Sequence, residues 1–352
     1  MHELNSWPVV LETVIAGNDL SIGQASWVME RIMLGEASDA HVGALLGSLR
    51  AKGEAVEELV GFRDAILTHA MPLEGDSEML DIVGTGGDRL KTVNVSTMAS
   101  IVVAASGVPV LKHGNRAVSS LSGTGDVLQM LGLVPESTDP KVVREIFDEV
   151  GISFAHASRF HPGFANVAGV RKSLGIPTVF NILGPLVHPA RPEASALGVA
   201  DRAMIDKFVG VYATRGATAL VFRGEDGLDE VSTTGFTQIF EVSRGDVIEY
   251  SLDARELGIP RAQLEDLRGG DPEHNAKIVE ETMAGARGPV RDIVLLNAAV
   301  GRAAWQLHKH PRNTDEPLLE RLREQLGIVT EALDSGAAQA KLTAWRSAVQ
   351  SR

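Results

Sequence analysis

The sequence predicts an α/β protein in which a small all-helical N-terminal domain precedes a large α/β domain with a mostly parallel central sheet. Two patterns support this class. Before residue 70, apolar residues recur at helical spacing and the connections are short. From Met79 onward, short apolar runs are followed by glycine-rich turns and amphipathic segments, as in βα units. A chain of 352 residues is long enough to bury a core in both parts.

The helical part carries clear start and stop signals. Ser21 and Gln24 form a capping-box pattern, Ser38 can cap the next helix, and Gly53 can end it. We expect residues 1–74 to form the helical domain and residues 75–352 the α/β domain. A short amphipathic helix near residues 166–174 interrupts the βα series, and we expect residues 165–190 to pack onto the helical domain.

Five apolar runs are candidate strands of the large domain. Ligands of a parallel sheet bind at the carboxyl ends of its strands. The polar motifs described below follow such runs or lie in a helix that faces them. The candidate strands are Leu80–Val83, Val108–Leu111, Ile152–Phe154, Ser195–Val199 and Ala219–Phe222.

Composition limits the classes of partner and compartment. Lysine and arginine number 33 against 46 carboxylates, which gives a formal net charge of −13. Such a surface repels nucleic acid and anionic membranes, so a phosphate ligand needs a local group of donors. The chain has no cysteine, which excludes disulfides and thiolate chemistry, and its first residues lack the pattern of a signal peptide. These features predict a cytoplasmic protein that binds neither nucleic acid nor membrane.

The stretch GTGGDRLKTVNVST, residues 84–97, is a candidate phosphate-binding loop. Glycines allow positive φ angles and close approach of a ligand, and the start of the following helix adds main-chain N–H donors. The alternative is a tight βα turn with ordinary helix caps. The loop matches neither GxGxxG nor a Walker A sequence, which argues against a dinucleotide fold or a nucleoside triphosphatase.

The stretch KHGNRAVSS, residues 112–120, follows the next apolar run. Lys112 can act as a point charge on a phosphate, and Arg116 can bind one bidentately. The alternative is a solvated basic loop. His113 is a candidate acid or base, although Asn115 is the better candidate for touching a small polar substrate.

The stretch GEDGLDE, residues 224–230, places four carboxylates in six positions after another strand. Neighbouring carboxylates repel each other unless a cation compensates, and hard oxygen ligands suit Mg²⁺ shared with substrate phosphates. The alternative is an exposed acidic turn. Arg171, on the short amphipathic helix, is either a surface charge or a guanidinium that holds a carboxylate.

Taken in order, GTGGD, NVST, KHGNR, RFHP, VRKSLG, TVFNILGPL and DGLDE resemble the anthranilate phosphoribosyltransferase family of tryptophan biosynthesis. The resemblance runs from the N-terminal helices to beyond residue 240. It implies a nucleoside phosphorylase/phosphoribosyltransferase-like, class II fold and a homodimer formed through the helical domain. It also implies Mg²⁺-assisted attack of the anthranilate amine on C1 of phosphoribosyl pyrophosphate (PRPP), with no catalytic side chain beyond positioning and electrostatics.

The resemblance also implies site residues. Mg²⁺ would be bound by Ser96, Asp229 and Glu230, and anthranilate would contact Gly84, Asn115 and Arg171. The implied PRPP site consists of Gly84, Gly87, Asp88, Thr92, Asn94, Val95, Ser96, Thr97, Lys112, His113, Gly114, Asn115, Arg116, Ala117, Val118, Ser119, Ser120 and Thr124.

Several positions depart from the family pattern. Arg89 stands where glycine is common, and His188 occupies the usual asparagine of an NPA motif. His156 and Ser158 differ near the acceptor channel, and residues 123–126 read GTGD instead of GSAD. Two alternative functions stay open, a pyrimidine nucleoside phosphorylase and a nucleic-acid-binding relative without activity. The GTGGDRLKTVN loop differs from the KxSTGG loop of the first, and the net charge with Asp229 and Glu230 argues against the second.

Overall fold

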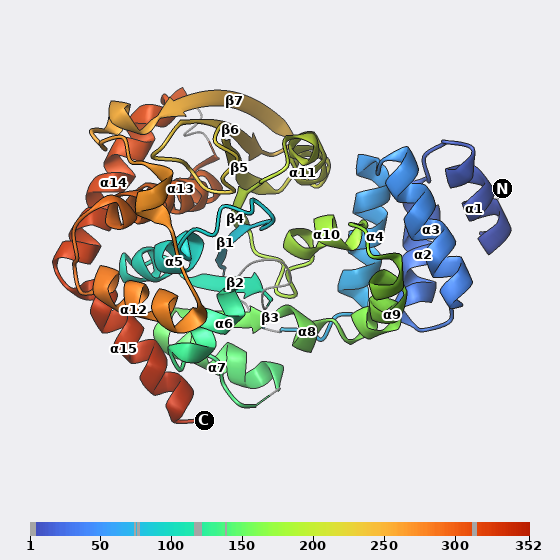
Figure 1. Cartoon of the computed structure of the whole chain (residues 1–352), viewed down its shortest axis with the longest axis horizontal. Coiled ribbons are helices and arrows are strands. Elements are labelled where there is room, and N and C mark those ends of the chain that lie inside the picture. The colour runs from blue at the N-terminus through green and yellow to red at the C-terminus, as the bar shows by residue number, and fades with distance from the viewer. Residues whose placement is uncertain (1–4, 74, 76–77, 116–121, 138, 312–314) are drawn as a thin grey trace.

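The chain folds into a helical bundle beside a larger α/β unit (Figure 1). The computed structural model describes residues 5–73, 75, 78–115, 122–137, 139–311 and 315–352. The bundle is formed by α1 (Trp7–Ile15), α2 (Ile22–Met33), α3 (Asp39–Lys52) and α4 (Val56–Thr68). Its predicted caps are confirmed, because Ser21 Oγ accepts the Gln24 N–H at 3.3 Å and Ser38 Oγ accepts the His41 N–H at 3.3 Å.

The large unit is built on a seven-stranded sheet with the order β3-β2-β1-β4-β5-β6-β7. Five neighbouring strands are parallel, and the last two pair antiparallel. The mostly parallel sheet that the sequence predicted is therefore confirmed. The strands are β1 (Leu80–Gly84), β2 (Val110–Gly114), β3 (Ile152–His156), β4 (Ala194–Gly198), β5 (Thr218–Gly224), β6 (Phe236–Ser243) and β7 (Asp246–Asp253).

One strand prediction is corrected, and one hairpin was not predicted. The expected strand Val108–Leu111 instead runs over Val110–Gly114, because Lys112 and His113 are buried members of the ladder that pair with β3. The hairpin β6–β7 was missed. Its turn residues Arg244 and Gly245 both have positive φ, 53° and 91°, as a two-residue hairpin turn requires.

Alternate residues of each strand face two different cores. Ile82, Leu220 and Phe222 face a core formed with α5 (Val95–Ala105) and α13 (Pro289–Lys309). Leu197, Ala219 and Val221 face α11 (Arg202–Thr214), and this second core continues into the helical bundle. The remaining helices of the large unit include α6 (Thr124–Met130), α7 (Pro140–Val150), α8 (Ala157–Phe160), α12 (Pro272–Met283), α14 (Leu318–Asp334) and α15 (Ala337–Gln350).

Two short helices join the bundle although they belong to the middle of the chain (Figure 1). α9 (Ala165–Leu174) packs on α2 and α3, and α10 (Phe180–Leu183) packs on α4. Asn166 Nδ2 donates to the carbonyls of Ile32 and Met33 at 3.1 and 3.0 Å, at the end of α2. The chain therefore crosses between the two units after α4, before α9 and after α10.

Candidate active site

The candidate site lies where the carboxyl ends of β1, β2, β4 and β5 meet at one edge of the sheet. Two segments dominate this edge: the glycine loop, residues 85–94, and the acidic turn, residues 225–235. Thr85 joins the glycine loop to β4, because its N–H donates to Gly198 O at 2.9 Å and its Oγ1 accepts the Ala200 N–H at 3.0 Å. Both segments follow parallel strands of the same sheet, so their side chains converge as the sequence predicted.

The glycine loop has an unusual backbone. Gly86 and Gly87 have φ angles of 66° and 86°, and Arg89 and Lys91 also have positive φ, 61° and 58°. Two adjacent glycines adopt this region without steric cost, whereas the two cationic residues adopt it against the usual preference. Arg89 thus stands in a backbone conformation that favours glycine.

Residues 267–275, which follow the last strand of the sheet in the sequence, form hydrogen bonds with the glycine loop. Val93 N–H donates to Leu267 O at 2.9 Å, and Gly269 N–H donates to Lys91 O at 2.8 Å. Asn275, at the start of α12, accepts the Gly270 N–H through Oδ1 at 2.7 Å and donates through Nδ2 to Asn94 Oδ1 at 2.9 Å. Because its oxygen is engaged, the Asn94 amide presents its NH₂ group to any further partner.

The acidic turn is joined to the glycine loop and to α5. Gly86 N–H donates to Asp229 Oδ2 at 2.7 Å, and Ser96 N–H donates to Glu230 Oε1 at 3.2 Å. Gly84 lies so near that an added Cβ would be 2.3 Å from Asp229 Oδ2. Two stretches far apart in the sequence therefore form one rigid edge.

The acidic turn carries carboxyls with perturbed pKa values. Burial, followed by the charge of Asp88, raises the pKa of Asp229 to about 6. Burial and the neighbouring Asp229 raise the pKa of Glu230 well above its usual value. Burial also raises the pKa of Asp88. A bound cation would relieve this repulsion, so the group has the chemistry of a magnesium site.

The other two acids of this turn have different environments. Asp226 accepts hydrogen bonds from Ser232 Oγ, Thr234 Oγ1 and, at 3.0 Å, the Leu228 N–H, so it shapes the turn. Glu225 is exposed. Among the described residues, no three His, Cys, Asp or Glu side chains are grouped closely enough to hold a metal ion by themselves. Mg²⁺ at this edge would need oxygen ligands from a substrate as well, which is how this ion usually binds phosphates.

Lys112 lies beneath the site. Its side chain is 1% exposed, and Nζ donates to Ile82 O and lies 3.4 Å from Ser96 O. Burial lowers its pKa to about 8, while the nearby Asp81 and Glu230 favour the charged form. The positive charge of Lys112 therefore lies beneath the acidic turn and the start of α5, close to Glu230 and Ser96.

His113 belongs to a buried histidine group with His161 and His188. The His113 ring centroid lies 5.5 Å from that of His161 and 5.3 Å from that of His188. His188 Nε2 donates to Leu111 O at 2.9 Å, and its Nδ1 accepts the Ala190 N–H at 3.1 Å, which fixes a neutral tautomer. Burial lowers the pKa of His161 and of His188 to about 4 and that of His113 well below its usual value.

A series of rings leads from this group to Arg171. His161 stacks on Phe164 at 5.0 Å between centroids, Phe164 meets Phe180 edge to face at 5.5 Å, and the Arg171 guanidinium lies 5.4 Å from the Phe180 centroid. Burial lowers the pKa of Arg171. The predicted acceptor residue thus stands on an aromatic surface formed by Phe164, just before α9, and Phe180 of α10.

The remaining predicted site residues have varied positions. Asn115 is exposed just beyond β2, and its carbonyl accepts the Gly125 N–H at 3.2 Å. An added Cβ at Gly114 would lie 3.8 Å from the Thr124 side chain, so these two residues are neighbours. Val95 and Thr97 are buried in the first turn of α5, while Gly87 and Thr92 lie in the glycine loop. The predictions for Arg116, Ala117, Val118, Ser119 and Ser120 lie outside the described residues.

Sequence reasoning missed two asparagines that support the site, Asn275 and Asn297. Asn297 is 1% exposed within the apolar helix α13, and its amide bonds to both main-chain groups of Val231 in the acidic turn. The available signal was an amide inside the run DIVLLNAAVG, because a buried amide requires hydrogen-bond partners.

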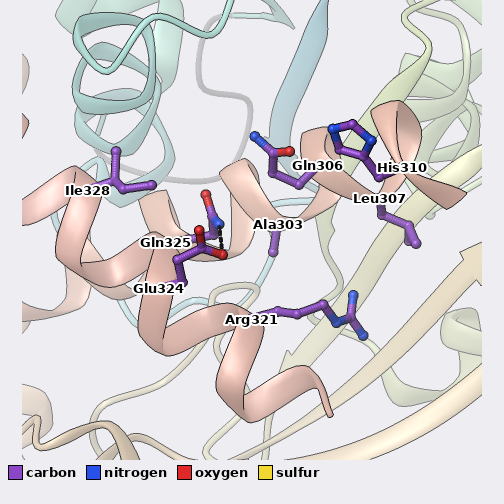
Figure 2. A pocket seen from close by; sticks show the side chains of 8 residues that line it. All are labelled: Ala303, Gln306, Leu307, His310, Arg321, Glu324, Gln325 and Ile328. Atoms are coloured by element: carbon purple, nitrogen blue, oxygen red, sulfur yellow. Dashed lines mark hydrogen bonds between the residues drawn. The ribbon is translucent and has the colours of Figure 1, made fainter. Parts of the chain in front are cut away.

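A separate cavity of about 240 Å³ lies between α13 and α14, away from this edge (Figure 2). Gln325 Nε2 donates to Glu324 Oε2 at 3.1 Å (Figure 2). Gln325 Oε1 accepts from Arg302 Nε at 3.0 Å. Arg321, which also lines the cavity, pairs with the buried Glu241 at 2.6 Å. These polar side chains bind one another and so hold α13 and α14 together, which explains why they lie between the two helices.

In the described part of the chain, no helix has the length and apolar character needed to cross a bilayer.

Comparison with known proteins identifies the class. Residues 8–70 match the family described as "Glycosyl transferase family, helical bundle domain", and residues 76–339 match "Glycosyl transferase family, a/b domain". The fold and the site edge thus define a two-part glycosyl transferase.

Full-length relatives narrow this class. The anthranilate phosphoribosyltransferase of Leifsonia xyli subsp. xyli is 57% identical over 350 residues, covering 99% of this chain and 100% of that protein. That of Thermobifida fusca is 48% identical over 347 residues, covering 99% and 98%. The chain belongs to the anthranilate phosphoribosyltransferase family.

Solved structures agree. The enzyme of Thermus thermophilus superimposes with a TM-score of 0.87 at 38% identity, covering 97% of this chain and 99% of that one. The Saccharomyces cerevisiae enzyme in complex with PRPP and Mg gives a TM-score of 0.86 at 27% identity, covering 98% of each chain. The fold class predicted from the sequence is confirmed, and the comparisons favour neither the nucleoside phosphorylase nor the nucleic-acid-binding alternative.

Proposed function

We propose that this chain transfers the phosphoribosyl group of PRPP to the amine of anthranilate, giving N-(5-phosphoribosyl)anthranilate and pyrophosphate, in tryptophan biosynthesis. The observation that carries the proposal is the junction of the glycine loop and the acidic turn, made by the 2.7 Å bond from Gly86 N–H to Asp229. That junction places main-chain donors and carboxylates at one edge of the sheet, as a metal-bound diphosphate needs.

The reaction needs positioning more than proton transfer. The C1–O bond to pyrophosphate breaks while the amine nitrogen bonds to C1, and the nitrogen then releases a proton. An aromatic amine is uncharged near neutral pH, so no strong base is required. In our proposal the glycine loop and Lys112 stabilise the charge that builds on the departing pyrophosphate, and no side chain acts as a covalent nucleophile.

Magnesium would be held by Asp229, Glu230 and the hydroxyl of Ser96. The raised pKa values of the two carboxyls support this assignment, because their repulsion favours a cation between them. When bound, the ion would neutralise pyrophosphate oxygens. The Saccharomyces cerevisiae relative was solved in complex with PRPP and Mg, which supports the same metal here.

The PRPP phosphates and ribose would contact the glycine loop, the start of α5 and the segment after β2, including the residues outside the described ranges. Asn94 contributes its NH₂ group, since Asn275 engages its oxygen. Anthranilate would lie toward Asn115 and Arg171, with Gly84 at the boundary between donor and acceptor. The aromatic surface of Phe164 and Phe180 beside Arg171 suits a flat ring with a carboxylate.

We further propose a homodimer formed through the helical bundle. Three apolar side chains of the bundle are exposed: Ile15 on α1 by 67%, Ile22 on α2 by 41% and Leu34 beyond α2 by 48%. Contact with a partner subunit would remove this apolar surface from water. A division at residues 74 and 75, with residues 165–190 on the bundle side, would allow the two units to close over the substrates. Light scattering at several protein concentrations tests the dimer, and an Ile15→Glu variant should shift it toward monomer. A cytoplasmic location stays a prediction from the sequence.

Loss of anthranilate fluorescence tests the activity. We expect it to require both PRPP and Mg²⁺ and to be nearly abolished in Asp229→Ala/Glu230→Ala. Glu225→Ala is the matched control, because Glu225 is an exposed acid of the same turn and its loss should leave the rate unchanged. Full activity in the double variant would contradict the metal assignment, and consumption of thymidine with phosphate would instead favour the nucleoside phosphorylase.

A further inference from the structure

The side chain of Asn297 holds the acidic turn through hydrogen bonds to the main chain of Val231. Its Nδ2 donates to Val231 O at 2.9 Å, and its Oδ1 accepts the Val231 N–H at 2.8 Å. Nδ2 also donates to Ile293 O, one turn earlier on α13, at 2.8 Å. The amide thus uses both of its N–H groups and its oxygen, and it is anchored to its own helix.

The residue that Asn297 binds is Val231, which directly follows Glu230. Val231 is fully buried, so its main-chain N–H and C=O have no access to water and need protein partners. Further bonds to the turn come from Gly86 to Asp229 and from Ser96 to Glu230. Asp229 and Glu230 are therefore bound by the glycine loop and α5, and the residue that follows them is bound by α13.

Two neighbouring carboxylates, one of them buried and the other half-buried, need such support. Their mutual repulsion favours turning one of them away toward solvent, which would remove it from the metal position. A backbone fixed at Val231, directly after the two carboxylates, opposes this movement, as residues behind a metal ligand commonly do.

We propose that Asn297 is a positioning residue that fixes the backbone of the acidic turn so that Asp229 and Glu230 bind Mg²⁺ together. This inference rests on the proposed function. Asn297 touches neither substrate nor metal and acts through Val231.

The side chain required at this position is specific. Alanine would leave the N–H and C=O of Val231 unpaired in the core, and aspartate would keep only the acceptor and would face the Val231 carbonyl with a negative charge. Both substitutions remove the two-point grip, but aspartate conserves the shape. The pair therefore separates the loss of the hydrogen bonds from the loss of volume.

Direct metal binding is the decisive measurement. Mn²⁺ titration followed by electron paramagnetic resonance, with pyrophosphate present, reports on the acidic turn without turnover. We expect at least tenfold weaker Mn²⁺ binding in Asn297→Ala and in Asn297→Asp than in the parent. Steady-state kinetics should show a raised KM for PRPP and a raised Mg²⁺ requirement, with the KM for anthranilate within twofold.

Arg302→Met is the matched control. Arg302 is a buried polar residue of the same helix whose Nη1 donates to Ser106 O at 2.9 Å, away from the acidic turn. It should lose stability and keep the Mn²⁺ affinity of the parent. A folded Asn297 variant that binds Mn²⁺ within twofold of the parent overturns the proposal.

Failure of the Asn297 variants to fold also has a defined meaning. If neither variant folds while Arg302→Met does, Asn297 is required for folding rather than positioning, and the proposal is overturned. A parent chain that consumes no anthranilate would instead contradict the proposed function, because the comparison of Mn²⁺ binding between parent and variant does not depend on turnover.

Discussion

Gly84 Cα faces Asp229 so closely that any side chain at residue 84 would displace the carboxylate. A Cβ there would lie 2.3 Å from Oδ2 and 3.3 Å from the main-chain oxygen of Asp229. The last residue of β1 is thus constrained by the position of a side chain more than one hundred residues later, through contact rather than through its own φ angle.

Replacement of Gly84 by alanine should therefore disturb the site more than the fold. We expect kcat/KM for PRPP to fall by about 100-fold, equivalent to about 2.7 kcal/mol of transition-state stabilisation. The measurement is steady-state kinetics together with urea unfolding.

Gly327→Ala is the control for this substitution. Gly327 lies within α14 with no atom near its added Cβ, so alanine should stabilise the helix by about 0.5–1 kcal/mol and leave the kinetics unchanged. Normal activity in Gly84→Ala would show that Asp229 can move without consequence.

The hydrogen bond between Asn275 and Asn94 should set the affinity for the phosphoribosyl donor. In Asn275→Asp the new carboxylate would repel Asn94 Oδ1, so the Asn94 amide would turn and present its oxygen to the donor. We expect KM for PRPP to rise by about tenfold, about 1.4 kcal/mol, with little change in KM for anthranilate. An equal rise in both constants would indicate a general loss of structure instead.

Stability should fall in mild acid because of His188. Its folded-state pKa of about 4 is below the ordinary value of about 6.5, since burial disfavours the charged form. The unfolded chain then binds the proton first, so the stabilisation is fully present above pH 6.5 and is lost as the pH falls toward 4. Between pH 7.5 and 5 this one group should cost about 2 kcal/mol.

The check is urea unfolding at several pH values for the parent and His188→Asn. Asparagine can still accept the Ala190 N–H but does not titrate, so the slope of stability against pH should become shallower in this range. His161 also has a pKa of about 4 and should leave part of the slope. His113, Glu193 and Lys112 are the other titratable groups that act on His188. An unchanged slope would contradict the assignment.

The ion pair of Arg321 and Glu241 should matter for stability alone. The two side chains are 5% and 1% exposed and lie 2.6 Å apart. Arg321→Leu would leave a buried carboxylate without its cation, and we expect a loss of about 3 kcal/mol. Addition of Glu241→Gln should recover much of it. Thermal and urea unfolding measure both effects, and a change in the KM for PRPP in either variant would show unexpected coupling to the site.

The sequence predicted the parts of the fold that depend on local pattern. The capping residues Ser21 and Ser38 and the apolar strands were recognisable because each acts on its immediate neighbours. The β2 boundary was misplaced because Lys112 and His113 are polar, and their burial depends on partners from other strands. The β6–β7 hairpin was missed although the pair Arg244 and Gly245 is compatible with its turn.

The sequence predicted which residues form the site better than it predicted which of them bind one another. The family resemblance already singled out Asp229 and Glu230, and the structure adds the physical reason for leaving Asp226 out, because Ser232 and Thr234 are bound to Asp226. Likewise, no local pattern links Asn297 to Val231 or Asn275 to Asn94, because each contact joins elements that only the tertiary fold brings together. Long-range partners of buried polar groups are therefore what the sequence withheld.

The order of strands in the sheet has a consequence for synthesis on the ribosome. β1 lies between β2 and β4, and β4 is Ala194–Gly198, so the middle of the sheet stays open until the chain beyond it has emerged. Closing so long a loop is slow compared with forming the local β6–β7 hairpin. The helices α1 to α4 can assemble while translation continues, whereas the edge that would bind the diphosphate is completed only after the acidic turn, residues 225–235, has emerged.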